Sequence, residues 1–79
     1  MTLNLARNFL LLPFIHRASA LKKLNVLDDD ELSNLFKSES AQALEIYKVA
    51  FGRLRERNQI RDLEHVVMNL HNLDLRERN

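Results

Sequence analysis

The sequence contains no cysteine and no tryptophan, and only one glycine and one proline among its 79 residues. Without cysteine, neither a disulfide framework nor a cysteine-ligated metal site can form. A single glycine also excludes the P-loop and Rossmann phosphate-binding loops, which need several glycines close together. Sandwiches and barrels use frequent glycine and proline at their turns, so the composition disfavours an all-β fold as well.

What the chain does contain predicts one small helical domain. Hydrophobic residues make up 46% of it and charged residues 29%, which is too apolar for disorder. Cores in chains below about 70–80 residues rarely contribute more than about 3–5 kcal/mol, and such chains often add a disulfide, a metal or a second subunit. Disulfides are excluded, and the spacing of His65 and His71 fits no helical metal site. We therefore expect self-association to complete the bundle.

The first predicted helix covers residues 3–24. Its apolar stripe passes through Leu10, Phe14 and Leu21 at helical spacing, and further apolar residues widen it, so the helix should be buried on more than one side. Pro13 lies inside the stripe and lacks a backbone N–H. We expect either a kink there or a short first helix followed by a second.

The same segment resembles a weak targeting sequence, because it combines a short apolar run with basic residues and no acid. Its apolar run is at the short end for a signal peptide, so we favour a structural helix. No stretch approaches the roughly 18 consecutive apolar residues of a membrane-spanning helix. We therefore expect a cytoplasmic protein without a membrane partner.

The second predicted helix covers residues 29–57. Asp28 or Asp29 is a good N-cap, because a carboxylate accepts hydrogen bonds from the free amides of the first helical turn. Beyond it, an apolar seam at heptad spacing includes Phe36, Ile46 and Ala50, although Glu39 and Arg53 interrupt it. Gly52 costs about 1 kcal/mol relative to alanine inside a helix, so we expect it to mark close packing or a bend.

A third helix is predicted over residues 59–72, with Asn58 as its N-cap and residues 73–79 as a frayed tail. The apolar stripe slips by about one residue near Asn58, and it then resumes through Leu63 and Val67. The motif Leu-Arg-Glu-Arg-Asn occurs at residues 54–58 and again at 75–79. Either the repetition is a coincidence in a charged helical composition, or it forms a paired docking element.

Taken together, these patterns predict an all-α protein of three or four helices, in which a helical hairpin and a C-terminal helix form a bundle completed by oligomerisation. The apolar residues expected at the interface with a partner or a second subunit are Leu10, Phe14, Leu21, Phe36, Ile46, Ala50, Leu63 and Val67.

Residues capable of catalysis are sparse. Ser33, Ser38 and Ser40 have no histidine nearby in sequence and no nucleophile–base pair is visible, so we expect neither an enzyme nor a cofactor site. The acidic block at residues 28–31 lacks the spacing and central glycine of a calcium loop, so it predicts helix capping. A net charge of +1 argues against general polyanion binding. Local basic stretches offer candidate nucleic-acid contacts at Lys22, Lys23, Arg53, Arg55, Arg57 and Arg61.

Residues 21–31 read Leu-Lys-Lys-Leu-Asn-Val-Leu-Asp-Asp-Asp-Glu, which resembles the hairpin turn of the repressor-of-primer (Rop) family, Leu-Glu-Lys-Leu-Asn-Glu-Leu-Asp-Ala-Asp-Glu. Weaker matches continue at Ala43, Glu45, Tyr47 and Arg53. The resemblance implies a helical hairpin that dimerises as an antiparallel four-helix bundle and clasps a pair of RNA loops with its first helices.

The resemblance has clear boundaries. Lys23 alone matches the family's RNA-contacting positions, and Glu39 stands where the family has a core leucine. Residues 55–79 have no counterpart. The resemblance therefore favours the architecture more than RNA binding.

The function favoured by the sequence is that of a small helical regulatory or adaptor protein. It would act through helix–helix contacts with another protein, as a homodimer. The alternative is an RNA- or DNA-binding regulator that uses its basic helix surfaces.

Overall fold

The structure, a computed structural model, describes residues 2–78, and within them the chain is all-α with no strand. The predicted fold class is therefore confirmed. The predicted number of helices is wrong, because two of the expected helices each divide in two. The five helices are α1 (Thr2–Leu11), α2 (Phe14–Lys23), α3 (Asp29–Lys37), α4 (Ser40–Glu56) and α5 (Ile60–Arg78).

The first expected helix, residues 3–24, divides at Pro13 into α1 and α2. Pro13 has an extended ψ of 150°, and its carbonyl accepts hydrogen bonds from the backbone N–H groups of His16 and Arg17. Proline suits this place at the start of a helix, since its missing N–H would have no partner there. The sequence predicted either a kink at Pro13 or two separate helices, and the structure shows two separate helices.

Two asparagines supply the left-handed backbone that glycine usually provides at helix ends. Asn25 follows α2 with φ 53°, and Asn58 follows α4 with φ 59°. In each case the N–H of the asparagine and the N–H of the residue after it donate back into the last helical turn, to the carbonyls of residues 22 and 21 after α2 and of residues 55 and 54 after α4. This is the Schellman arrangement. Asn58 therefore ends α4, and its predicted role as the N-cap of the next helix is corrected.

The acidic block caps α3 as predicted. The Asp28 carboxylate accepts a hydrogen bond from the Glu31 N–H at 2.7 Å, and Glu31 Oε1 accepts one from the Asp28 N–H at 2.9 Å. This reciprocal pair is a capping box.

The second expected helix, residues 29–57, divides at Ser38 and Glu39, both of which have extended backbone conformations. An unbroken helix would have placed Glu39 on the apolar seam. The division leaves Glu39 exposed instead, which avoids the cost of burying an unpaired carboxylate.

The predicted third helix, residues 59–72, is longer than expected. As α5 it begins at Ile60 and continues through the predicted frayed tail at 73–79 as far as Arg78. Leu73 and Leu75 are exposed, so tertiary packing does not hold this end. Its leucine, arginine and glutamate residues are strong helix formers, and their intrinsic preference accounts for the extension.

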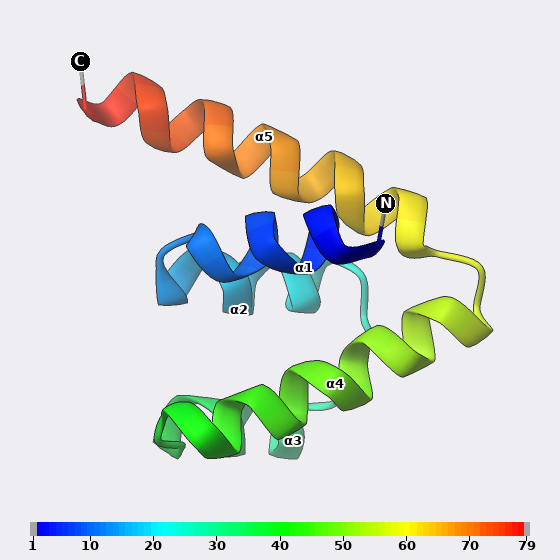
Figure 1. Cartoon of the computed structure of the whole chain (residues 1–79). Coiled ribbons are helices and arrows are strands. Elements are labelled where there is room, and N and C mark those ends of the chain that lie inside the picture. The colour runs from blue at the N-terminus through cyan, green and yellow to red at the C-terminus, as the bar shows by residue number, and fades with distance from the viewer. Residues whose placement is uncertain (1, 79) are drawn as a thin grey trace.

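The helices close around one hydrophobic core. α5 packs against α1, α2 and α4, and α3 packs against α2 and α4. Figure 1 shows α1 between α5 and α4, with α2 behind it. The core contains apolar residues from every helix and from the loop between α2 and α3, and no polar or charged residue is buried among the residues described.

The core also corrects half of the predicted interface. Leu21, Ala50, Leu63 and Val67 are buried inside the single chain, so they present no surface to a partner. The apolar stripes were identified only in part, since Leu10 and Phe36 on them are exposed, and the chain buries the others by folding five short helices onto one another.

Arg53 ties α4 to the start of α3. Its Nη1 donates to Glu31 Oε1 at 2.7 Å and to the Val26 carbonyl at 3.0 Å. The hydrogen bond from Arg53, followed by the one from the Asp28 N–H, lowers the pKa of the Glu31 carboxyl below its ordinary value.

We expect Glu31→Gln to lower the melting temperature near neutral pH and to have little effect at about pH 3. A pKa that is lower in the folded state than in the unfolded state stabilises the fold above the unfolded pKa. This contribution is lost as the pH falls through the folded pKa. Melting curves at both pH values measure it, with Glu45→Gln as the control, since Glu45 lies on α4 and forms only a solvent-exposed pair with Lys48. If Glu31→Gln lowered the melting temperature equally at both pH values, the ion pair between Glu31 and Arg53 would be contradicted.

Candidate functional site

A groove with a mostly apolar lining runs between α1 and α4. Its volume of about 430 Å³ lies in the range of protein binding sites. Phe9 of α1 meets Tyr47 and Phe51 of α4 across it, so aromatic side chains bridge the two helices. The lining residues are Ala6, Phe9, Leu10, Leu44, Tyr47, Lys48, Phe51, Gly52 and Arg55.

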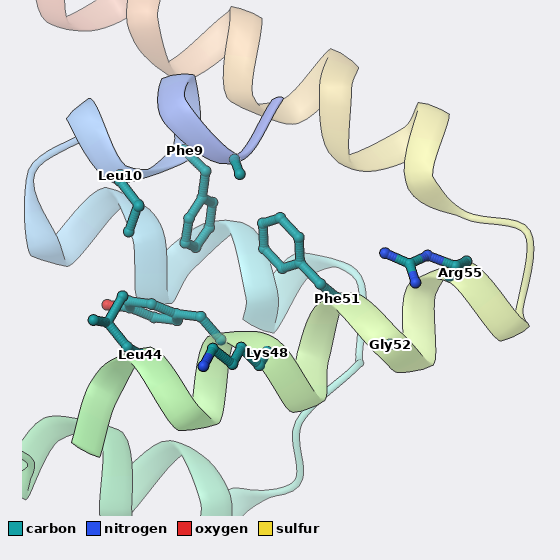
Figure 2. A pocket seen from close by; sticks show the side chains of 9 residues that line it. Phe9, Leu10, Leu44, Lys48, Phe51, Gly52 and Arg55 are labelled. Atoms are coloured by element: carbon teal, nitrogen blue, oxygen red, sulfur yellow. The ribbon is translucent and has the colours of Figure 1, made fainter. Parts of the chain in front are cut away.

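Three aromatic rings form the floor of the groove. Phe9, from α1, is completely buried and makes edge-to-face contacts with Tyr47 and Phe51 of α4, at centroid distances of 5.1 and 5.2 Å. Figure 2 shows Phe9 and Phe51 extending toward each other from the two helices. Edge-to-face packing fixes ring orientation, so the floor is part of the folded core.

Tyr47 is a neutral floor residue. Burial raises the pKa of its hydroxyl, and the Arg17 guanidinium, 5.5 Å from the ring centroid, partly opposes this shift. The hydroxyl therefore stays protonated at neutral pH. It has no hydrogen-bond partner among the residues described.

Leucines and cations form the rim. Leu10 and Leu44 are each 44% exposed, so the apolar lining extends to the open surface. Lys48 and Arg55 are the charged lining residues, and both are exposed. No acidic residue lines this groove. Lys48 forms only a solvent-exposed pair with Glu45 at 3.4 Å, which restrains it weakly.

The predicted interface residues that keep exposed surface lie in two places. Leu10 is on the rim of the α1–α4 groove. Phe36 lines a second hollow between α2 and α3, beside Ile15. Phe14 and Ile46 are partly buried against the core. Lys22 and Asp29 both line the second hollow, so its charge is mixed. Self-association stays a prediction.

The predicted nucleic-acid contacts do not form one basic face. Arg53 is paired with Glu31, and Arg57 donates to the Asn25 carbonyl at 3.0 Å. Lys22 and Lys23 lie just before the same loop. The hollow that contains Arg53 and Arg57 is also lined by Asp28, Asp29 and Glu31. Arg55 is on the rim of the other groove, and Arg61 is exposed near the start of α5.

The repeated Leu-Arg-Glu-Arg-Asn motif occupies two different environments. Leu54 is fully buried at the end of α4, whereas Leu75 is 56% exposed on α5. The last residue of the second copy, Asn79, lies outside the described residues. The leucines of the two copies are therefore not equivalent, which argues against a paired docking element.

Neither a metal-binding cluster nor a membrane-spanning helix is present within residues 2–78. No group of three or more histidine, aspartate or glutamate side chains is arranged to hold a metal ion. None of the helices has the length and apolar character needed to cross a membrane.

Of the nine residues that line the groove, only Leu10 and Arg55 are among the contacts predicted from the sequence, and the other seven are not. Leu44 and Lys48 lie off the heptad seam, on the face of α4 that a single-helix analysis assigns to solvent. A signal was present at Leu44, Lys48, Phe51 and Arg55, which recur at spacings of four, three and four. This second stripe combines apolar residues with cations.

No protein-family model, curated protein or solved structure matches this chain. The resemblance to the Rop family therefore stays an expectation from the residues alone. In the structure, the stretch that carries it joins α2 and α3, which pack against each other.

Proposed function

We propose that this protein is a small helical adaptor that binds a helix of another protein in the groove between α1 and α4. The apolar groove itself is the observation that carries the proposal. It follows α4 from Leu44 to Arg55, a length of about 16 Å at 1.5 Å per residue, or three helical turns. Grooves between helices commonly receive the apolar face of an amphipathic helix.

The rim favours a macromolecule over a small enclosed ligand. Leu10 and Leu44 carry the apolar lining to the surface, where a partner can cover them. Phe9 fixes the floor, so a partner meets a preformed surface and loses less entropy on binding.

Nucleic-acid binding, the alternative from the sequence, has weaker support. Of its six candidate cations, Arg53 and Arg57 already hold the loop between α2 and α3, among acidic side chains. The remaining four are spread over α2, α4 and α5. Such a distribution provides little of the continuous positive surface that phosphate backbones require.

Photocrosslinking tests the proposed groove. We expect p-benzoylphenylalanine in place of Leu44 to crosslink a discrete protein in an extract of the cells that make this chain. The same group in place of His65, which is exposed on α5 and lines no hollow described above, should not do so. Adding Gly52→Gln, which fills the groove, should abolish the product. Equal crosslinking from both positions, or an unchanged product with Gly52→Gln, would argue against a groove-bound partner.

A further inference from the structure

The only glycine of the chain lies inside α4 where the fold has no use for it. A helix-interior glycine costs about 1 kcal/mol relative to alanine. A Cβ added at Gly52 would meet nothing within 4 Å, so no neighbouring helix requires a small residue there. The helix also runs unbroken past it, from Ser40 to Glu56. Close packing within the chain, one of the two expectations from the sequence, therefore does not explain it, and no interruption of α4 does either.

Gly52 does lie in the wall of the α1–α4 groove. Lys48, Gly52 and Arg55 are four and three residues apart, so they share one face of α4. Figure 2 shows Gly52 as a bare stretch of ribbon between the Lys48 and Arg55 side chains. This geometry leaves a notch in which another backbone can approach α4 closely, with a cation on each side.

From this arrangement, and resting on the proposed groove function, we infer that the partner is an acidic amphipathic helix. Its apolar stripe would cover Phe9 and Phe51, and it would cross α4 at Gly52. Carboxylates flanking the stripe would pair with Lys48 and Arg55. The groove lining contains two cations and no acid, so charge complementarity selects this partner and rejects a basic helix.

The same charges disfavour a second copy of this chain on the groove. Two α4 helices packed antiparallel about Gly52 would bring Lys48 of one copy toward Arg55 of the other. Like charges placed together in an interface oppose association. The groove is therefore suited to a different protein.

Two designed peptides test the inference directly. Both are alanine-based helices of about five turns with the same leucine stripe. The positions that flank the stripe are glutamate in one peptide and lysine in the other. We expect the glutamate peptide to bind at least about tenfold more tightly at low salt, as measured by fluorescence anisotropy, and this advantage should shrink as salt screens the charges. Because Gly52 is the only glycine, its amide resonance in an NMR titration locates the peptide without ambiguity.

Matched variants separate local charge from net charge. Lys48→Glu with Arg55→Glu should reverse the preference between the two peptides. Lys22→Glu with Lys23→Glu makes the same change in net charge on exposed lysines outside the groove, and it should leave the preference intact. Gly52→Gln should weaken binding of the glutamate peptide at least about tenfold. It should not lower the melting temperature of the protein, since the added side chain meets open space.

The outcomes distinguish the two proposals. If both peptides bind equally and both perturb the Gly52 amide, the groove function stands and the acidic partner is excluded. If both control and groove charge reversals change the preference equally, local complementarity is excluded. If neither peptide perturbs the Gly52 amide at millimolar concentration, the groove does not receive helices and both proposals fail.

Discussion

Phe9→Ala is expected to leave most of the protein unfolded at room temperature. Phe9 is completely buried, and it alone supplies the ring that joins α1 to Tyr47 and Phe51 of α4. Truncating a buried phenylalanine to alanine costs about 3–5 kcal/mol. A core of this size rarely supplies more than about 3–5 kcal/mol in total, so the loss consumes most of the stability.

Urea denaturation followed by circular dichroism measures the effect, with the adjacent Leu10→Ala as the matched control. Leu10 is on the same helix but lies on the groove rim, where nearly half of it is exposed. Its truncation should cost about 1 kcal/mol, because nearly half of its surface stays in water after folding and no closed cavity is left behind. Equal losses for the two variants would show that Phe9 does not join α1 to α4 as described.

The same pair of residues shows what the sequence could and could not predict. Leu10 and Phe14 belong to the stripe that predicted a helix, and the helices form. Phe9 lies beside that stripe, where it only widens the apolar face, yet it becomes the centre of the core and the floor of the groove. Helical periodicity assigns residues to faces of one helix. It does not say which face of a second helix will cover them, so Phe9 and Phe51 could not be paired in advance.

Helix ends were predictable where a side chain carries the signal. The Asp28 capping box follows directly from the residue types at 28 and 31. The division at Ser38 and Glu39 has a weaker signal, since neither proline nor glycine is present there and the capping hydrogen bond from the Glu39 N–H to Gln42 is long, at 3.4 Å. It arises because a continuous helix would bury Glu39. The sequence already shows Glu39 interrupting the apolar seam, but it does not show that the helix divides there in response.

Asn58 shows a different limit. Asparagine is a good residue both for beginning a helix and for ending one in left-handed conformation. With one glycine in the chain, asparagine takes over the second role, after α2 and after α4. The residue type alone marks a helix boundary, and the backbone geometry decides on which side of it the asparagine lies.

Ala50→Leu is expected to destabilise the protein by about 1–3 kcal/mol, whereas Gly52→Leu is not. Ala50 is fully buried on the face of α4 that also carries Tyr47 and Leu54 in the core. Three extra carbons there must displace packed neighbours. At Gly52 the same side chain enters open space and also gains the helix propensity that glycine lacks. Thermal melting should show a loss of about 4–8 °C per kcal/mol for Ala50→Leu.

The contrast between Ala50 and Gly52 matters because the sequence alone does not distinguish the two positions. Both are small residues on one helix, and both predicted close approach of a neighbour. A substantial loss of stability for Gly52→Leu would show that the fold itself needs a glycine there, and the groove would lose its notch. A stable Gly52→Leu beside a destabilised Ala50→Leu would leave the glycine without a role in folding. The presence of a glycine at position 52 would then be explained by a binding partner that packs closely against α4.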